Sequence, residues 1–243
     1  MKTKTFIAAA LVATSLGASA ATISFSDAFT DDASTGISTD NIYTHTIGGG
    51  QAATVNGVSF DLLNTTTTPA NFTWDYTGPA SKNQVTNFNN GWDPANGGVT
   101  GTDIINLLDS FTFANGLNSS QTFTLSGLTI GDTYDTRLYI RKWADASTRT
   151  IDFDFTNGAE VTSTTIDEDD PTTQGYPNTD YAYYLNYRFT AQATTLSIDA
   201  APESGSDSGF HLYALTNQFV PEPSSTALLR LGLSSLLLRR RRS

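Results

Sequence analysis

Cysteine is absent from the 243 residues, and histidine is scarce, with His45 and His211 as its two examples. The lack of cysteine excludes disulfides, thiol chemistry and cysteine-ligated metals. The two histidines lie far apart in strand-like surroundings, and no nucleophile elbow, H-E-x-x-H or P-loop motif is present. We therefore interpret both as structural histidines, and the sequence predicts no catalytic residue and no enzymatic activity.

Basic residues are scarce in the middle of the chain. Of the 13 lysines and arginines, only six lie between residues 21 and 219, where 23 of the 24 acidic residues also lie. Such an acidic body repels phosphate backbones, which argues against nucleic acid as a partner. It would attract divalent cations, although an acidic solvated surface is the simpler interpretation.

Helix-forming stretches are few, and alternation with a period of two dominates instead. Ile151, Phe153 and Phe155 alternate with Asp152 and Asp154, which gives one apolar and one acidic face. Gly-containing turn signals separate segments of this kind. The pattern predicts an all-β fold, a jelly-roll-like antiparallel β-sandwich formed by one domain over residues 21–219. One short helix is expected over residues 103–111, with Thr102 as its N-cap.

The N-terminus has the three regions of a secretory signal peptide over residues 1–20. Two lysines precede an apolar stretch, and an A-x-A site follows, formed by Ala18 and Ala20, with Ala21 as the expected mature start. An ordinary buried helix is the alternative, but the stretch is short for one. This pattern predicts export through the Sec machinery and cleavage by signal peptidase.

The C-terminus, residues 220–243, has three parts in order. The prolines of Val220-Pro221-Glu222-Pro223 favour an extended, accessible segment. An apolar run over 226–238 is shorter than the ~20 residues that span a bilayer comfortably. A basic cluster then favours the cytoplasmic side of a membrane, and it consists of Arg239, Arg240, Arg241 and Arg242.

These three parts resemble the PEP-CTERM sorting signal of Gram-negative bacteria. The resemblance implies a sorting helix that anchors transiently in the inner membrane. It also implies processing near Pro221-Glu222-Pro223 by an exosortase-type membrane protease. Arg230 departs from the pattern, because a charge inside the apolar run is costly. A plain tail anchor or an amphipathic helix is the alternative, and neither explains the Pro-Glu-Pro motif.

Segments of the body resemble the jelly-roll bodies of other exported PEP-CTERM proteins, and more loosely galactose-binding-like and malectin-like modules. The resemblance rests on four segments, namely 122–128, 131–134, 137–139 and 210–217. It implies a fold more than an activity.

Two tryptophans have neighbours that would suit a carbohydrate site. Trp92 lies with Asn90 and Asp93 in a glycine-rich loop, and Trp143 lies near Arg141. Exposed aromatic rings would stack on sugar faces while the polar side chains reach hydroxyl groups. The alternative is that both tryptophans belong to the core, since tryptophan is highly buried on average.

Acidic residues offer two further hypotheses. Asp167, Asp169 and Asp170 could hold a structural Ca²⁺, the only cofactor considered, although a solvated acidic loop is the alternative. A glycan-active hydrolase or lyase would need paired carboxylates about 5–9 Å apart, and Asp152 with Asp154 is one candidate pair.

Together these features predict an exported protein of the cell envelope or extracellular matrix that binds polysaccharide. The hydrolase and a purely structural matrix protein remain as alternatives.

Overall fold

The computed structural model describes residues 20–78, 81–116, 119–144, 149–203 and 209–221. The predicted signal peptide up to residue 19, with Ala18, lies outside the described residues. The same holds for the predicted sorting signal from Glu222 onward, with Pro223 and the cluster Arg239 to Arg242.

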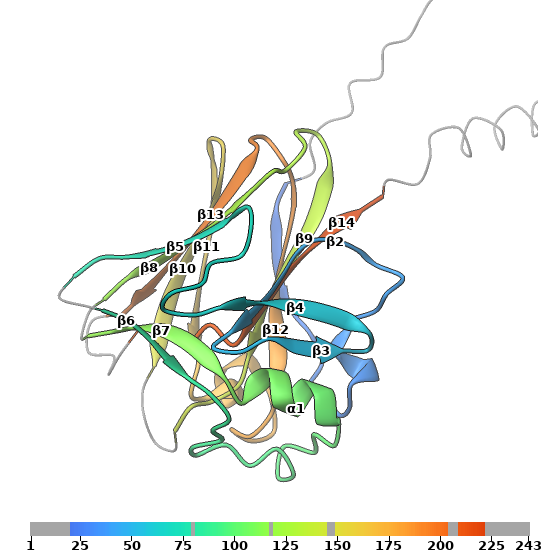
Figure 1. The fold of residues 1–243 in the computed structure, drawn as a ribbon, viewed down its shortest axis with the longest axis vertical. Coiled ribbons are helices and arrows are strands. Elements are labelled where there is room, and N and C mark those ends of the chain that lie inside the picture. The colour runs from blue at the N-terminus through green and yellow to red at the C-terminus, as the bar shows by residue number, and fades with distance from the viewer. Residues whose placement is uncertain (1–19, 79–80, 117–118, 145–148, 204–208, 222–243) are drawn as a thin grey trace, which may run out of the picture.

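Two β-sheets pack face to face and form a sandwich (Figure 1). The larger sheet has seven strands in the order β1-β12-β9-β14-β2-β4-β3. Neighbouring strands are antiparallel, except that β2 and β4 run parallel. In chain order these strands are β1 (Thr22–Phe25), β2 (Ile42–Gly49), β3 (Ala53–Val55), β4 (Val58–Leu63), β9 (Thr133–Ile140), β12 (Tyr183–Thr190) and β14 (Ala214–Val220).

The smaller sheet is antiparallel and has five strands in the order β11-β10-β13-β8-β5. They are β5 (Phe72–Tyr76), β8 (Gln121–Ser126), β10 (Thr150–Asn157), β11 (Glu160–Asp167) and β13 (Thr195–Pro202). A separate pair joins β6 (Ser81–Val85) to β7 (Phe111–Asn115). The helices are α1 (Thr102–Leu108) and the short 3₁₀ helices η1 (Ala33–Thr35) and η2 (Pro171–Gln174). The predicted antiparallel β-sandwich with one short α-helix is confirmed.

The main core lies between the two sheets and follows the alternation in the sequence. Phe153 and Phe155 of β10 and Leu138 of β9 are fully buried in it, whereas Asp152 and Asp154 are exposed. Burying each large apolar side chain contributes roughly 1.5–3 kcal/mol relative to leaving it in water.

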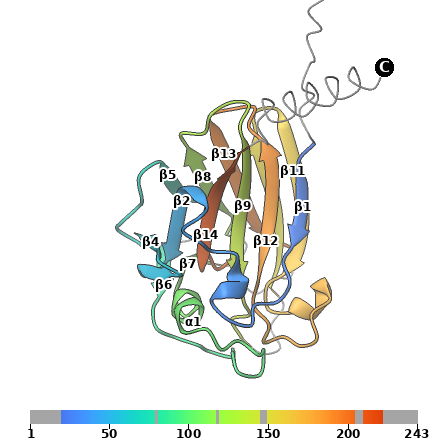
Figure 2. The ribbon, with the colours of Figure 1, turned by 90° about the vertical axis from the view of Figure 1, so that its right-hand side faces the viewer.

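A second core covers the outer face of the seven-stranded sheet near one end. Tyr139, on the face of β9 opposite to Leu138, is also fully buried, and it packs in a cluster with Leu107 of α1 and Tyr213. The sheet is therefore buried on both faces here, and α1 forms part of a third layer (Figure 2).

The helix begins differently from the prediction. Its N-cap is Gly101 and not Thr102, and the helix ends at Leu108 instead of residue 111. Asp32, from the loop before η1, supplies the capping interaction, because its Oδ1 accepts the Ile104 N–H at 2.8 Å. A Cβ at position 101 would lie 2.4 Å from the backbone nitrogen of Asp32, so this close approach requires glycine. The expected cap was wrong because a distant side chain occupies its role.

Both ends of the described chain lie at the same end of the sandwich. Val220, the last residue of β14, is opposite Thr133, and Ala20 and Thr133 line the same hollow. From Thr133, β9 runs to Ile140 over about 23 Å at ~3.3 Å per residue. We call the end where β9 finishes the distal end (Figure 2). None of the helices in the described ranges is long and apolar enough to cross a membrane.

Candidate functional site at the distal end

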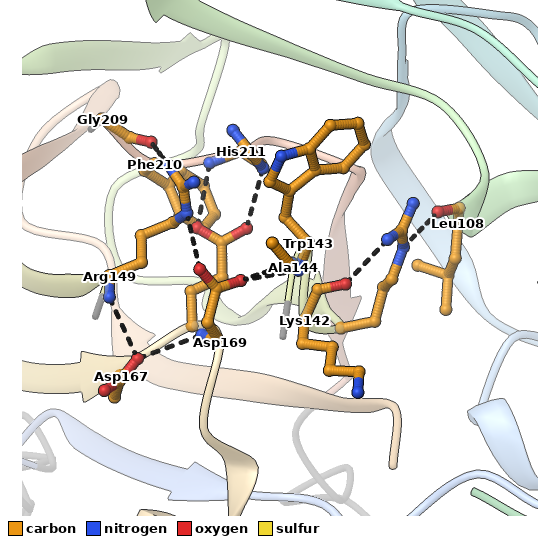
Figure 3. A network of polar contacts seen from close by, with 12 residues as sticks. Leu108, Lys142, Trp143, Ala144, Arg149, Asp167, Asp169, Gly209, Phe210 and His211 are labelled. Carbon is orange, nitrogen blue, oxygen red and sulfur yellow. Dashed lines mark hydrogen bonds and ion pairs between the residues drawn. The ribbon is translucent and has the colours of Figure 1, made fainter. Parts of the chain in front are cut away.

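Three segments that are distant in sequence meet at the distal end of the sandwich. The first is Arg141 to Trp143, directly after β9, and the second is Gly209 to Tyr213, directly before β14. The third is the acidic run 167–170, which begins at the last residue of β11 (Figure 3). The loop after β6 joins them through Phe88 and Trp92. This arrangement places aromatic rings and buried charges side by side.

Arg141 is fully buried and fixes the backbone of this region. Its Nε donates to the Leu108 carbonyl at 2.8 Å, Nη1 to the Lys142 carbonyl at 2.7 Å and Nη2 to the Phe88 carbonyl at 3.0 Å. Burial lowers the pKa of its guanidinium, while Tyr213 and nearby carboxylates act in the opposite direction. The guanidinium therefore holds the scaffold together. The carbohydrate hypothesis required it to be exposed to a ligand, and it is buried instead.

The same guanidinium brings the two predicted tryptophans together. It lies 5.0 Å from the ring centroid of Trp92, 5.8 Å from that of Trp143 and 4.6 Å from that of Tyr213. Cation–π contacts of a desolvated arginine contribute to stability, and here one guanidinium contacts three aromatic rings.

Trp92 is in the core, as the alternative interpretation proposed. It is 3 % exposed, and its Nε1 donates to the backbone carbonyl of Asp180 at 2.9 Å. Asp93 has a local role, because its Oδ1 accepts the Ala95 N–H at 3.0 Å. Asn90 is exposed on the same loop. In this structure the faces of Trp92 are covered, so its ring has no surface on which a sugar could stack.

Asp180 attaches the Trp92 loop to the end of β9. Its Oδ1 accepts the Asp93 N–H at 3.0 Å and lies 2.8 Å from Lys142 Nζ, and its Oδ2 accepts a hydrogen bond from Asn96. Burial alone would raise the pKa of Asp180, but these hydrogen bonds outweigh burial and leave the pKa below its ordinary value. The carboxylate is therefore charged at neutral pH and holds the loop.

Trp143 differs from Trp92, because it is partly exposed beside a second accessible ring. Phe88 is 50 % exposed, and its ring centroid lies 5.6 Å from that of Trp143. Behind them, Phe111 and His211 contact the Trp143 ring edge-on at 4.9 and 5.5 Å. Phe88 and Trp143 form an accessible aromatic pair on a packed aromatic base.

The acidic run is engaged in hydrogen bonds and ion pairs of the fold. Asp169 Oδ1 accepts the Trp143 N–H at 2.6 Å, and its Oδ2 lies 3.3 Å from Arg149 Nε. Asp167 Oδ1 accepts the Asp169 N–H at 3.1 Å, and Asp170 Oδ1 accepts the Thr172 N–H at 3.1 Å at the start of η2. Within the described residues, these carboxylates do not form a group of three acidic or histidine ligands able to hold a metal.

Glu168, in the same run, points into the protein and contacts His211. Both side chains are almost completely buried. Burial, aided by Asp169, raises the pKa of Glu168 well above its ordinary value, against the opposite effect of Arg149. Burial, with Arg149 and Arg141, lowers the pKa of His211 well below its ordinary value. These directions favour a protonated carboxyl beside a neutral imidazole at neutral pH.

The other histidine, His45, lies in β2 and is also buried. Its ring nitrogens lie 3.0 Å from Thr44 Oγ1 and 3.0 Å from the Asn71 carbonyl oxygen. Burial lowers the pKa of His45, partly countered by the contact with Asn71. Its contacts agree with the structural role expected from the sequence.

The candidate carboxylate pair lies elsewhere, on the outer face of the five-stranded sheet. Asp152 and Asp154 are exposed and accept hydrogen bonds from Thr165 and Ser163 of β11. The register also places Asp199 of β13 directly opposite Asp154. Residues in such positions have Cβ atoms about 4.5–5.5 Å apart, so Asp199 is the closer partner for Asp154, and no local sequence pattern indicates this pairing.

Sequence reasoning missed the residues that matter most at the distal end. Phe88, Glu168 and Asp180 lie in polar loops, where no periodicity shows which side chain points inward. The only available signal was the strand-like segment around His211, which indicated the fold and not its partner.

The comparisons with known proteins give distant likenesses of fold. No protein-family profile matches the chain, and no curated protein matches it significantly. The extracellular domain of ANXUR1 from Arabidopsis thaliana is 14% identical with a TM-score of 0.46, and the match covers 74% of this chain and 47% of that one. A structure of carbohydrate-binding modules from the β-sandwich superfamily is 13% identical with a TM-score of 0.33, covering 63% of this chain and 58% of that one.

The enzymatically active domain of tailspike protein 4 from bacteriophage CBA120 is 11% identical with a TM-score of 0.34, covering 62% of this chain and 20% of that one. The chain spans less than two thirds of the length of each of these three proteins.

Proposed function

We propose that this sandwich is the body of an exported envelope or matrix protein and binds extracellular polysaccharide at its distal end, without catalysing a reaction. The observation that carries the proposal is the accessible aromatic pair formed by Phe88 and Trp143. Aromatic faces of this kind offer large, rigid apolar area to the apolar faces of sugar rings.

The backbone that carries each ring is held before any ligand arrives. The Phe88 carbonyl accepts a hydrogen bond from Arg141, and the Trp143 N–H donates to Asp169. A preorganised surface loses less conformational entropy on binding than a flexible one. Ile130 and Val161 are also exposed, but their aliphatic side chains offer no ring face to a sugar.

The position of the pair fits a protein held by its C-terminus. The predicted processing motif begins at Val220, at the end of the sandwich opposite to the aromatic pair. A chain anchored in the inner membrane, or attached to the envelope after exosortase-type processing, would present the distal end outward. Signal peptidase and the Sec machinery are the partners of the earlier export step.

Affinity electrophoresis of the exported full chain through gels containing purified neutral or acidic polysaccharides tests the binding. We expect at least one polysaccharide to retard the protein, and Phe88→Ala or Trp143→Ala to weaken this binding about tenfold, as truncation of a central aromatic contact does. Phe25→Ala is the matched control, since Phe25 is 38% exposed on β1. Equal retardation of all four proteins would exclude the aromatic pair as the site.

The two alternatives give different results in the same assay. A purely structural matrix protein would migrate unchanged in every gel. A glycan-active hydrolase would release reducing ends from a polysaccharide, and Asp154→Asn or Asp199→Asn would abolish the release.

Fractionation and intact-mass measurement in a Gram-negative host with an exosortase test the sorting. We expect a mature protein that ends near Pro223 and that stalls in the inner membrane when processing is blocked. A mature mass that still includes residues 239–242 would show that the tail is a plain anchor.

A further inference from the structure

The first packed residue of the body contacts a carboxylate from a distant strand. The Ala21 N–H donates to Glu160 Oε1 at 3.1 Å, across 139 residues of sequence. The second oxygen of Glu160 accepts a hydrogen bond from Gln192 Nε2 at 2.8 Å. Glu160 begins β11, an edge strand of the smaller sheet, and Ala21 precedes β1, an edge strand of the larger one. The contact therefore links the edges of the two sheets.

Packing also begins at this residue. Ala21 and Ile23 are partly buried against the main core, whereas Ala20 is exposed. Among the described residues, the folded body thus starts at the position where the sequence predicts the mature N-terminus.

Cleavage before Ala21 would change the chemistry of its nitrogen. In the precursor this atom is a neutral amide with one N–H, and in the mature chain it is an ammonium with three N–H groups and a positive charge. A carboxylate accepts hydrogen bonds only, and its bonds to charged donors are stronger than those to neutral ones. Arg188, opposite Thr22 in β12, is paired with Asp135 at 3.9 Å.

We infer that Glu160 is the receptor for the N-terminal ammonium that signal-peptide removal creates, and that the bond cleaved is Ala20–Ala21. The inference rests on the proposed export. A start one residue earlier or later would move the ammonium by about 3.8 Å along the chain, out of hydrogen-bond reach of Glu160. The ion pair then joins the two sheet edges only in the mature protein.

The test uses the full chain, secreted from a Gram-negative host with its own N-terminus, as wild type and as Glu160→Gln. Glu203→Gln is the matched control. It removes one carboxylate charge, as Glu160→Gln does, but at the other end of β10. Glu203 lies beside Thr150, the first residue of β10, whereas Glu160 is opposite Asn157, the last one. Intact mass gives the first residue of each mature protein. Amine acylation at pH 7.5, followed on the N-terminal peptide by mass spectrometry, then reports how much of the amine is uncharged.

We expect all three proteins to start at Ala21. Because only the neutral amine reacts, we expect Glu160→Gln to be acylated about threefold faster than wild type, as for a partly exposed ion pair, and Glu203→Gln at the wild-type rate. A start at Ala21 with equal rates for wild type and Glu160→Gln would overturn the receptor role and leave the export proposal intact. A different first residue would overturn the assigned bond, and an uncleaved chain would overturn the export itself.

Discussion

Glu168 contacts His211 through both oxygens of its carboxyl group. Oε2 accepts the backbone N–H of His211 at 3.1 Å, and Oε1 lies 3.6 Å from the imidazole Nδ1. Both atoms are buried, and neither Oε1 nor Nδ1 has another hydrogen-bond partner among the residues that the structure describes. The separation slightly exceeds a hydrogen bond, so a small movement would place one shared proton between them. The pair joins the acidic run after β11 to the segment before β14.

This pair predicts an unusual dependence of stability on pH. In the unfolded chain the carboxyl titrates near ~4.3 and the imidazole near ~6.5. The pKa of Glu168 is raised and that of His211 is lowered in the folded protein, so the folded pair holds one proton throughout that interval. The unfolded pair also holds one there, and its contribution to stability is flat. Above ~6.5 the folded pair retains a proton that the unfolded chain loses, and below ~4.3 the unfolded chain gains a second one. The pair's contribution to the free energy of unfolding therefore declines above ~6.5 and below ~4.3. Urea unfolding across pH 4–9 would measure this dependence.

Glu168→Gln is the diagnostic variant for this prediction. The variant lacks the carboxyl and keeps only the lowered pKa of His211. Above ~6.5 it should therefore not show the decline of wild type, and below ~6.5 its stability should fall while the contribution of the wild-type pair stays level down to ~4.3. A difference between the two proteins that does not vary with pH would contradict the assignment of one proton to the pair.

Replacing Arg141 should destabilise the protein even with the charge kept. Arg141→Lys cannot reach the carbonyls of Leu108, Lys142 and Phe88 together, and each buried carbonyl that loses its donor costs about 1–3 kcal/mol. We expect a loss of about 3 kcal/mol in the free energy of unfolding by urea denaturation, with a changed near-ultraviolet signal from Trp92 and Trp143.

Arg188→Lys is the control for that variant, because the Arg188 side chain is 51% exposed and its ion pair is long. Its stability should stay within about 0.5 kcal/mol of wild type. A similarly small effect of Arg141→Lys would show that its three hydrogen bonds are replaceable.

The helix α1 offers a paired test of its N-terminal cap. Asp32→Ala removes the acceptor of the Ile104 N–H and should cost about 1 kcal/mol, the usual effect of losing a cap. Thr102→Ala removes the cap that the sequence suggested, and it should change stability by a few tenths of a kcal/mol at most, since alanine favours helix. Thermal unfolding of both variants decides between them, and the reverse order would restore Thr102 as the cap.

Calcium should have little effect on stability. Asp169 already binds Arg149 and the Trp143 N–H, and a cation would have to displace these contacts. We expect the thermal midpoint to be the same after dialysis against EDTA and in millimolar CaCl₂. A thermal midpoint that rises saturably with Ca²⁺ concentration, and that no longer rises in Asp170→Asn, would instead support the site suggested by the sequence. A ligand that binds the folded state stabilises it.

The sequence determined the features that depend on neighbouring residues. The alternation of Ile151, Phe153 and Phe155 with two aspartates decided which face of β10 is buried, because successive side chains of a strand point to opposite sides. The same local rule gave an antiparallel sandwich with a scarcity of helix. The A-x-A site at Ala18 and Ala20 separately predicted a boundary at Ala21, and Ala21 is partly buried against the core.

Only the tertiary structure decided which polar side chains meet. Glu168 and His211 are 43 residues apart, Arg141 and Phe88 are 53 apart, and Trp92 and Asp180 are 88 apart. These contacts join loops at the ends of strands, where the chain has no period that fixes the direction of a side chain. Their partners are chosen by the need to satisfy every buried charge and carbonyl, and this condition applies to the assembled fold and not to any local stretch of sequence.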